Sequence, residues 1–299
     1  MPKVSIGLPV YNGAKFIRNA LDTLLAQSFG DFELIISDNC STDDTEAICK
    51  EYSNKDSRIR YIKQPENIGI SRNMEFLLHQ ARGEFFMWAA DDDLWAKDFL
   101  QTLLAMLEEN TNLVVAFCPF YFIDEESSEP IEGMKIRSVD YSGKFALYRL
   151  IKLCYFYDDG CGYGLFRRKL IEDVHLPVWW GVNKLTAFNN MYPPIFYFLS
   201  VGDFRLANLN GLWEKRLRIH PRHIVPFSEK LFLRYVAYLL IKINVVYQSL
   251  GNVYKGSNSF LLVIAITPFV FLRFIVECLY LIMRLGRAYV LKIYNKVGK

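Results

Sequence analysis

The sequence predicts an α/β fold built on a mostly parallel, doubly wound sheet. Short apolar runs rich in β-branched residues alternate with amphipathic segments along residues 3–117, and this alternation is typical of strand–helix–strand units. The chain has 299 residues, of which 52% are hydrophobic and 15% aromatic, so it can bury a large core and is not disordered. Polar residues directly follow several apolar runs, and in such sheets ligands bind beyond the carboxyl ends of the strands.

Each predicted element in the first half has its own signal. Apolar runs that end at glycine, proline or charged residues predict strands at residues 3–10, 32–37, 59–62, 84–90 and 113–117. Apolar residues that repeat on one helical face predict helices at residues 14–27, 71–80 and 97–109. A further helix should run to about Tyr52, with Ser41 or Thr42 as its N-cap.

Three polar strand ends should meet at one edge of this sheet: Pro9, Tyr11 and Asn12 after the first strand, Asp38 and Asn39 after the second, and the acidic triplet at residues 91–93. Asp91, Asp92 and Asp93 follow the apolar run at residues 84–90, and buried acids are costly unless they are paired or bind a metal. This triplet therefore predicts a cation site, although a solvated turn that caps a helix at residues 94–109 is an alternative reading. No GxGxxG motif follows the first strand and no GxxxxGK[ST] motif is present, which argues against a dinucleotide-binding site and excludes a P-loop ATPase.

The C-terminal region differs in charge from the rest of the chain. Residues 230–299 hold ten Lys or Arg and one acid, Glu277, for a net charge of +9, while the first 229 residues carry −6. The apolar stretch at residues 260–283 contains Arg273, Glu277 and Pro268, which disfavour a full membrane span. We expect one or two helices in the cytoplasmic leaflet, with a span or a helical dimerisation tail as alternatives.

The six cysteines have no metal-ligand spacing and no signal peptide is evident, which indicates a cytosolic compartment.

Four motifs in order resemble the family-2 glycosyltransferases, of the bacterial glycan-synthesis type. They occupy residues 4–13, 36–43, 67–73 and 91–95. The resemblance implies a GT-A fold, a nucleotide-diphosphate sugar as donor, a divalent metal, and transfer with inversion at the anomeric carbon. It divides the chain into a nucleotide-sugar-binding half at residues 1–118, an acceptor-binding half at 119–228 and the helical membrane-associating region at 229–299.

The resemblance also assigns roles to the residues that bind the nucleotide. Asp38 matches the family's acid that accepts a hydrogen bond from the base, with Asn39 beside it, and a helix-capping role is the alternative for Asp38. Arg72 would reach the nucleotide or a phosphate, or would be a surface helix cation. The loop against the base and ribose, and the family's Asn-x-Gly-x-x-Arg segment, contribute Pro9, Tyr11, Asn12, Asn67 and Gly69.

The acidic triplet departs from the commoner family pattern, Asp-x-Asp-Asp. The first acid of that pattern falls on Ala90, while this chain carries an additional acid at Asp91. Mg²⁺ or Mn²⁺ needs only one or two carboxylates beside the phosphate oxygens. We therefore expect Asp93 and Asp91 to be metal ligands and Asp92 to contact the sugar or support the site.

The general base is harder to assign. An inverting transferase needs a carboxylate to take the proton of the acceptor hydroxyl, and the polar, aromatic segment at residues 155–168 offers Asp158 and Asp159. The family often has an acidic pair where this chain has Asn189 and Asn190, and an amide cannot act as a base. The remaining options are altered catalysis, or another carboxylate among Asp203, Glu172 and Asp173.

The sequence thus predicts a glycosyltransferase at the cytoplasmic face of the membrane. UDP-sugar is the favoured donor, a glycan or lipid-linked saccharide is the acceptor, and a homo-oligomer is compatible with the sequence. Three basic residues near the end of the acceptor half, Arg216, Arg218 and His220, resemble a segment that returns to the nucleotide, or form a solvated strand. A non-catalytic nucleotide-sugar or glycan-binding membrane subunit is the alternative function. A nucleotidyltransferase ranks below both because its glycine-rich phosphate loop is missing.

Overall fold

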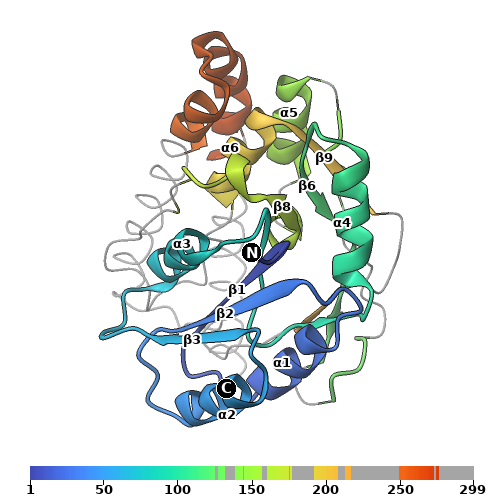
Figure 1. Cartoon of the computed structure of the whole chain (residues 1–299). Helices are drawn as coiled ribbons and strands as arrows, with labels where there is room; N and C mark the ends of the chain where they lie inside the picture. The colour runs from blue at the N-terminus through green and yellow to red at the C-terminus, as the bar shows by residue number, and fades with distance from the viewer. Residues whose placement is uncertain are drawn as a thin grey trace, which may run out of the picture.

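The protein is an α/β structure with helices on both faces of a central sheet (Figure 1). The computed structural model describes residues 1–124, 127–131, 139–143, 145–156, 160–174, 176, 192–207, 213–216, 249–272 and 274–275. The described part of the main sheet has seven strands in the order β3-β2-β1-β4-β8-β6-β9. They are β1 (Val4–Val10), β2 (Phe32–Asp38), β3 (Ile59–Lys63), β4 (Phe85–Trp88), β6 (Leu113–Phe117), β8 (Leu165–Arg167) and β9 (Asp203–Leu206).

The direction of the strands fixes where their ends lie. β1 pairs in parallel with β2 and β4, β2 with β3, and β6 with β9, whereas β8 is antiparallel to both β4 and β6. Six of these seven strands therefore end at the same edge of the sheet, which we call the carboxyl edge. β8 runs the other way, so its first residue lies near the carboxyl edge and its last near the opposite edge.

Alternating side chains of the buried strands supply two separate cores. In β4, Phe86 and Trp88 belong to one core, while Phe85 and Met87 belong to the other. On one face lie α1 (Ile17–Leu25), α2 (Thr45–Lys55) and α4 (Phe99–Glu109). On the other face lie α3 (Ile70–Gln80), α5 (Ala146–Phe156) and α6 (Tyr192–Val201). Both faces of the sheet are covered, which explains why its strands are continuous apolar runs.

A second, three-stranded sheet adjoins the acidic triplet. β5 (Leu94–Trp95) pairs antiparallel with β10 (Trp213–Arg216), which pairs in parallel with β7 (Phe120–Ile123). The triplet is thus the link between β4 of the main sheet and β5 of the second sheet. The alternative reading of the triplet as a helix cap is wrong, because α4 begins only at Phe99 and the two residues after Asp93 form a strand.

The five strands and four helices predicted in the first half are confirmed with small shifts of their ends. The largest correction concerns α2, which begins at Thr45 and has no capping bond from Ser41 or Thr42. Ser41 instead accepts a hydrogen bond from the backbone of Asn12, because the loop after β2 is fastened to the loop after β1. β5 was not predicted, since two residues carry no periodicity.

The C-terminal helical residues pack against α6. Residues 249–257 and 260–272 are helical, and a Cβ on Gly256 would approach the Ser200 hydroxyl oxygen of α6 to 2.1 Å. Val253, Ile266 and Val270 are buried in the same core as α5 and α6. Among the residues described, no helix is long and apolar enough to cross a bilayer.

Candidate active site

The loops that follow β1 and β2 at the carboxyl edge are held together by hydrogen bonds. Asn12 donates its backbone N–H to the Ser41 hydroxyl at 2.9 Å and accepts the backbone N–H of Thr42 on its side-chain oxygen at 2.8 Å. The backbone N–H of Gly13 donates to the Thr45 hydroxyl at 2.9 Å. Asn12 has a positive φ of 54°, a conformation that asparagine tolerates better than most residues. The motif at residues 11–13 therefore forms a fixed turn that leaves the Tyr11 ring 49% exposed.

Asp38 is the last residue of β2, which lies between β3 and β1, and it is fully buried. One carboxylate oxygen accepts the backbone N–H of Ser41 at 2.8 Å, and the other accepts the Tyr61 hydroxyl at 2.7 Å. Burial, followed by this bond to Asp38, raises the pKa of Tyr61 well above its ordinary value, so the phenol remains a donor. Each carboxylate oxygen has two lone pairs, so the held carboxylate retains acceptor capacity for a ring N–H. The helix-capping alternative for Asp38 is wrong, because α2 begins at Thr45 after Asp44; the Ser41 bond closes the turn after β2 instead.

The loop after β3 is tied to the loop after β2 through asparagines. Asn39 donates its side-chain amide to the side-chain oxygen of Asn67 at 3.0 Å and accepts the backbone N–H of Ile68 at 2.9 Å. Gly69 has φ 83°, a region that side chains rarely adopt, which explains the glycine at this position. Arg72 lies exposed in the first turn of α3 and makes no ion pair within the described part of the chain.

The acidic triplet lies against the turn that follows β1. A Cβ added to Gly13 would come within 2.3 Å of a carboxylate oxygen of Asp91, so this glycine makes room for that carboxylate. Burial, and then the charges of Asp38, Asp91 and Asp43, raise the pKa of the Cys49 thiol to about 12. Asp38 and Asp91, from two strand ends, and Asp43, from the loop after β2, therefore all lie near the Cys49 thiol. The loops after β1 and β2 are bonded to each other and the triplet lies against the first of them, so the three polar strand ends meet as predicted.

The triplet has the donor chemistry of a hard cation site. Asp91 and Asp92 are half-buried and Asp93 is 2% exposed. No group of three or more His, Cys, Asp or Glu in the described ranges is arranged to hold a metal, so this is not an all-protein cage. Mg²⁺ is commonly held by one or two carboxylates together with substrate phosphates, and adjacent carboxylates at a strand end fit that kind of site.

Asp158 and Asp159 fall outside the described residues, but the segment that follows them is placed. The 3₁₀ turn Gly160–Tyr163 lies against β4 and β6. Leu165, the first residue of β8, pairs with Ala116 close to the end of β6. A Cβ on Gly164 would meet the Ala116 carbonyl oxygen at 2.5 Å, which explains the glycine. The chain thus enters β8 from the carboxyl edge, and the assignment of the base to Asp158 or Asp159 stays a prediction.

The other carboxylates considered as bases lie at the opposite edge of the sheet. Asp203 is the first residue of β9, which runs parallel to β6. Glu172 and Asp173 follow β8, whose last residue, Arg167, pairs with the first residue of β4. Their positions separate all three acids from the strand ends that carry Asp38 and the triplet.

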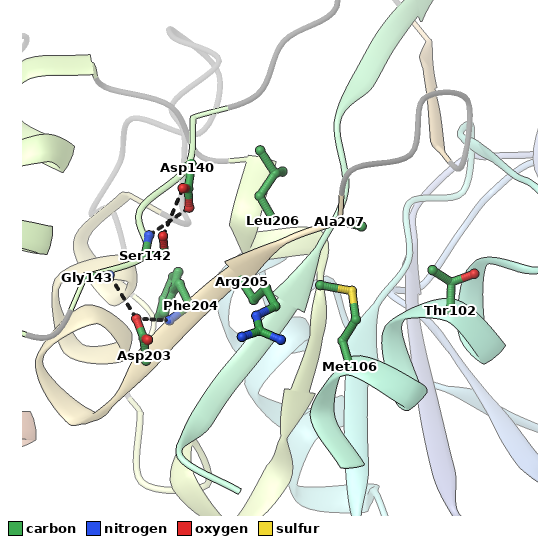
Figure 2. Close-up of a pocket in the computed structure, with 10 residues that line it drawn as sticks. All are labelled: Thr102, Met106, Asp140, Ser142, Gly143, Asp203, Phe204, Arg205, Leu206 and Ala207. Carbon is green, nitrogen blue, oxygen red and sulfur yellow. Dashed lines mark hydrogen bonds between the residues drawn. The ribbon is translucent and has the colours of Figure 1, made fainter. Parts of the chain in front are cut away.

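Asp203 belongs instead to a separate pocket of about 680 Å³ beside β9 and α4. Figure 2 shows Asp203 accepting backbone N–H bonds from Gly143 and Phe204, with Asp140 and Ser142 nearby. One oxygen of Asp203 is therefore occupied by loop contacts. This pocket is not part of the site at the carboxyl edge.

Two further predicted groups are placed only in part. Arg216 is the last residue of β10, whose partner β5 directly follows the acidic triplet, so the backbone returns to the predicted site. Arg218 and His220, together with Asn189 and Asn190, fall outside the described residues.

Sequence reasoning missed several residues that hold the site in shape. Tyr61 lies in β3, beside β2, and bonds to Asp38; the only sequence signal was an aromatic residue with a polar tip in a half-buried strand. Thr45 and Gly13 were read as part of a helix start and a turn, but they bond to each other across the two loops. Burial alone would raise the pKa of Asp43, but hydrogen bonds from Thr45 and the Ala14 backbone lower it.

This combination of parallel strands and strand-end acids defines a GT-A type of fold, and known structures agree. The structure of S. aureus TarS 1-349 in complex with UDP-GlcNAc matches with a TM-score of 0.57 and 20% identity, over 85% of this chain and 71% of that one. The mannosyltransferase PcManGT from Pyrobaculum calidifontis, in complex with GDP-Man and Mn²⁺, matches with a TM-score of 0.52 and 16% identity, over 99% of this chain and 80% of that one. At these identities the likeness concerns the fold alone.

The family itself follows from the sequence comparison. The model described as glycosyl transferase family 2 matches residues 5–174, and the chain belongs to that family. The putative teichuronic acid biosynthesis glycosyltransferase TuaG of Bacillus subtilis is 34% identical over 40% of this chain and 46% of its own length. The GalNAc(5)-diNAcBac-PP-undecaprenol beta-1,3-glucosyltransferase of Campylobacter jejuni is 26% identical over 67% of this chain and 62% of its own. The matches thus span less than two thirds of these curated relatives.

Proposed function

We propose that the protein transfers a hexose from a nucleotide-diphosphate sugar, with a UDP-sugar favoured, to a hydroxyl of a glycan or lipid-linked saccharide. The observation that carries this proposal is the fixed arrangement at the carboxyl edge. Asp38 is buried with both oxygens oriented by Ser41 and Tyr61, and Asp91 fills the space left by Gly13. Asp38 thus suits a hydrogen bond from a nucleobase, and Asp91 suits a divalent cation. A nucleotide-diphosphate sugar has a nucleobase for the first and a diphosphate that binds cations for the second.

The donor is supported by the residues and by the relatives. Asp38 accepts a hydrogen bond from the nucleobase ring, with Pro9, Tyr11 and Asn12 against base and ribose and Asn39 behind them. An exposed tyrosine ring offers a stacking face. Asn67 and Gly69 shape the loop from which Arg72 reaches the nucleotide or diphosphate. The similar structures hold UDP-GlcNAc or GDP-Man, which favours a nucleotide-sugar donor without selecting the nucleotide.

Asp93 and Asp91 hold a divalent metal, Mg²⁺ or Mn²⁺, and Asp92 contacts the sugar or supports the ligands. When bound, the metal neutralises charge on the departing diphosphate. The Mn²⁺ named for the Pyrobaculum mannosyltransferase supports this choice. Arg72 adds positive charge from the side of α3 and helps to orient the phosphates.

Inversion requires a carboxylate on the acceptor side. Asp158 or Asp159 takes the proton of the acceptor hydroxyl as that oxygen attacks the anomeric carbon, and the nucleotide diphosphate leaves from the opposite face. The entry of the chain into β8 from the carboxyl edge supports this choice. The positions of Asp203 and of the pair Glu172 and Asp173 at the opposite edge weigh against the alternatives.

The acceptor and the cellular location are proposed together. The name of the Campylobacter relative includes an undecaprenol-linked saccharide, and an acceptor of that kind resides in a membrane. The basic, apolar residues 230–299 would hold the enzyme at the cytoplasmic face, where anionic lipids attract Lys and Arg. We likewise propose the division of the chain into a nucleotide-sugar-binding half, an acceptor-binding half and a membrane-associating region, at residues 1–118, 119–228 and 229–299.

A non-catalytic nucleotide-sugar-binding subunit is the second candidate. It is favoured by Asn189 and Asn190, which stand where the family often has an acidic pair. Sugar transfer or donor hydrolysis by the purified protein separates the two functions.

A panel of nucleotide sugars tests the proposal. A ligand that binds the native state raises its apparent stability, so thermal unfolding with and without Mn²⁺ should single out one donor. Transfer of its sugar to a membrane extract, lost in Asp93→Asn while the fold is kept, would support the enzyme. Full activity of Asp93→Asn would refute its metal role.

A further inference from the structure

The exposed side of α5 is unusually aromatic. Phe145, Tyr148, Tyr155 and Phe156 are 70%, 53%, 77% and 52% exposed, and their spacing places them along one side of the helix. The opposite side, with Leu150 and Leu153, is buried in the core. We call these four exposed residues the α5 stripe.

A cationic side chain lies within the α5 stripe. The Lys152 ammonium lies 4.7 Å from the centre of the Tyr148 ring and donates to the backbone oxygen of Asp140 at 2.9 Å. Aromatic rings with polar tips and neighbouring lysines are the composition found at membrane–water interfaces.

The C-terminal helical residues carry a second apolar stripe. Exposed fractions range from 39% to 78% among five residues. Ile264 follows Leu261 by three residues, Leu272 follows Ile264 by eight, and Phe269 and Ile275 lie three residues on either side of Leu272. These spacings place the five residues on one helical side. The buried residues Ile266 and Val270 face the core. We call this set the C-terminal stripe: Leu261, Ile264, Phe269, Leu272 and Ile275.

Both stripes belong to helices that pack on the same support. α5 lies against α6, and the residues around Gly256 contact Ser200 and Tyr197 of α6. Figure 1 shows α5 and the C-terminal helical residues (orange) at the end of the molecule away from α2. α5 and the helix of the C-terminal stripe therefore bury one side in the core that α6 shares, and their apolar stripes are turned away from it.

We propose that the α5 stripe and the C-terminal stripe form one surface that lies on an anionic lipid bilayer. The partner is identified by charge, because residues 230–299, which include the C-terminal stripe, carry ten Lys or Arg against one acid. Each stripe covers one side of a helix whose other side is buried in the core, so both stripes lie in the interface plane. α5 thereby becomes a membrane contact outside the basic tail. That this contact brings the site to a membrane-bound acceptor rests on the proposed function, whereas the contact itself does not.

Vesicle binding by the full chain tests the surface without any sugar transfer. The protein is sedimented with phosphatidylcholine vesicles and with vesicles that also contain phosphatidylglycerol. Binding should be stronger to the anionic vesicles and should weaken with salt. Tyr155→Ser combined with Phe156→Ser should weaken binding about tenfold or more, because two exposed rings no longer insert. Phe269→Ser combined with Leu272→Ser should have a similar effect.

Matched variants give each outcome one meaning. Tyr11→Ser removes an aromatic ring that is 49% exposed at the carboxyl edge, so it should leave vesicle binding unchanged and weaken nucleotide-sugar binding. The Tyr155/Phe156 variant should do the reverse, with circular dichroism and thermal unfolding like the wild type. Unchanged vesicle binding of that variant would overturn the proposal. Equal binding to uncharged vesicles, or dissociation of a wild-type dimer by the same variant, would also overturn it, the latter in favour of a second copy as partner.

Discussion

Gly13→Ala is the substitution that most sharply probes the link between the β1 loop and the acidic triplet. The added Cβ would lie 2.3 Å from the Asp91 carboxylate oxygen and 2.6 Å from a Val10 methyl group, whereas ordinary contact begins at 3.4 Å. Asp91 must therefore retreat by about 1 Å. A misplacement of about 1 Å at a reacting centre costs on the order of 100-fold in rate, and we expect a loss of that size in metal-dependent transfer.

The fold should survive this change. Both clashing atoms belong to side chains rather than backbone, so shifts of the Asp91 and Val10 side chains relieve the clash, and overpacking of this kind costs about 1–3 kcal/mol. Chemical denaturation measures that cost, and calorimetry measures Mn²⁺-dependent binding of the donor.

Gly30→Ala is the matched control, because nothing lies within 4 Å of its added Cβ. It should keep full activity. If Gly13→Ala transfers sugar at the wild-type rate with the same metal dependence, then Asp91 is not a metal ligand.

Three further predictions concern the base, the nucleotide and pH. Asp158→Asn and Asp159→Asn are assayed singly, and at least one should lower turnover by about tenfold or more with donor affinity retained; two fully active variants would place the base elsewhere. Arg72→Ala should weaken donor binding about tenfold without destabilising the fold, because its side chain is exposed, and wild-type affinity by calorimetry would make it a surface cation. Tyr61 has a raised pKa in the folded state, so its contribution to stability is present below about pH 10 and is lost as pH rises further. Tyr61→Phe should therefore lose less unfolding free energy than the wild type between pH 8 and about pH 11, and an equal loss would contradict the bond to Asp38.

The core elements of the first half were predictable because the pattern of buried residues is visible in the sequence. β1 and β2 are buried along their whole length, which makes them continuous apolar runs, and α1 alternates buried and exposed residues at helical spacing. The placement of Asp38 and the triplet at the same edge of the sheet followed from strand direction alone. These inferences need only local pattern and the rule that parallel strands end at one edge.

Other features depend on contacts between distant segments, which leave no local signal. β5 exists because β10, more than one hundred residues later, pairs with it. The Ser41 hydroxyl could cap a helix in isolation, but the Asn12 backbone N–H uses it instead. Tyr61 was not singled out for the same reason, since its partner Asp38 is on the neighbouring strand.

Binding of a UDP-sugar, measured by calorimetry with Mn²⁺ and with a chelator, tests the central claim most directly. Three proteins suffice: the wild type, Asp93→Asn at the carboxyl edge, and Asp203→Asn in the separate pocket beside β9, where an amide oxygen can still accept the bonds from Gly143 and Phe204. The wild type and Asp203→Asn should bind more tightly with Mn²⁺ than with the chelator, and Asp93→Asn should lose that difference. Full metal dependence in Asp93→Asn, or its loss in Asp203→Asn, would contradict a metal-assisted nucleotide-sugar site at the carboxyl edge.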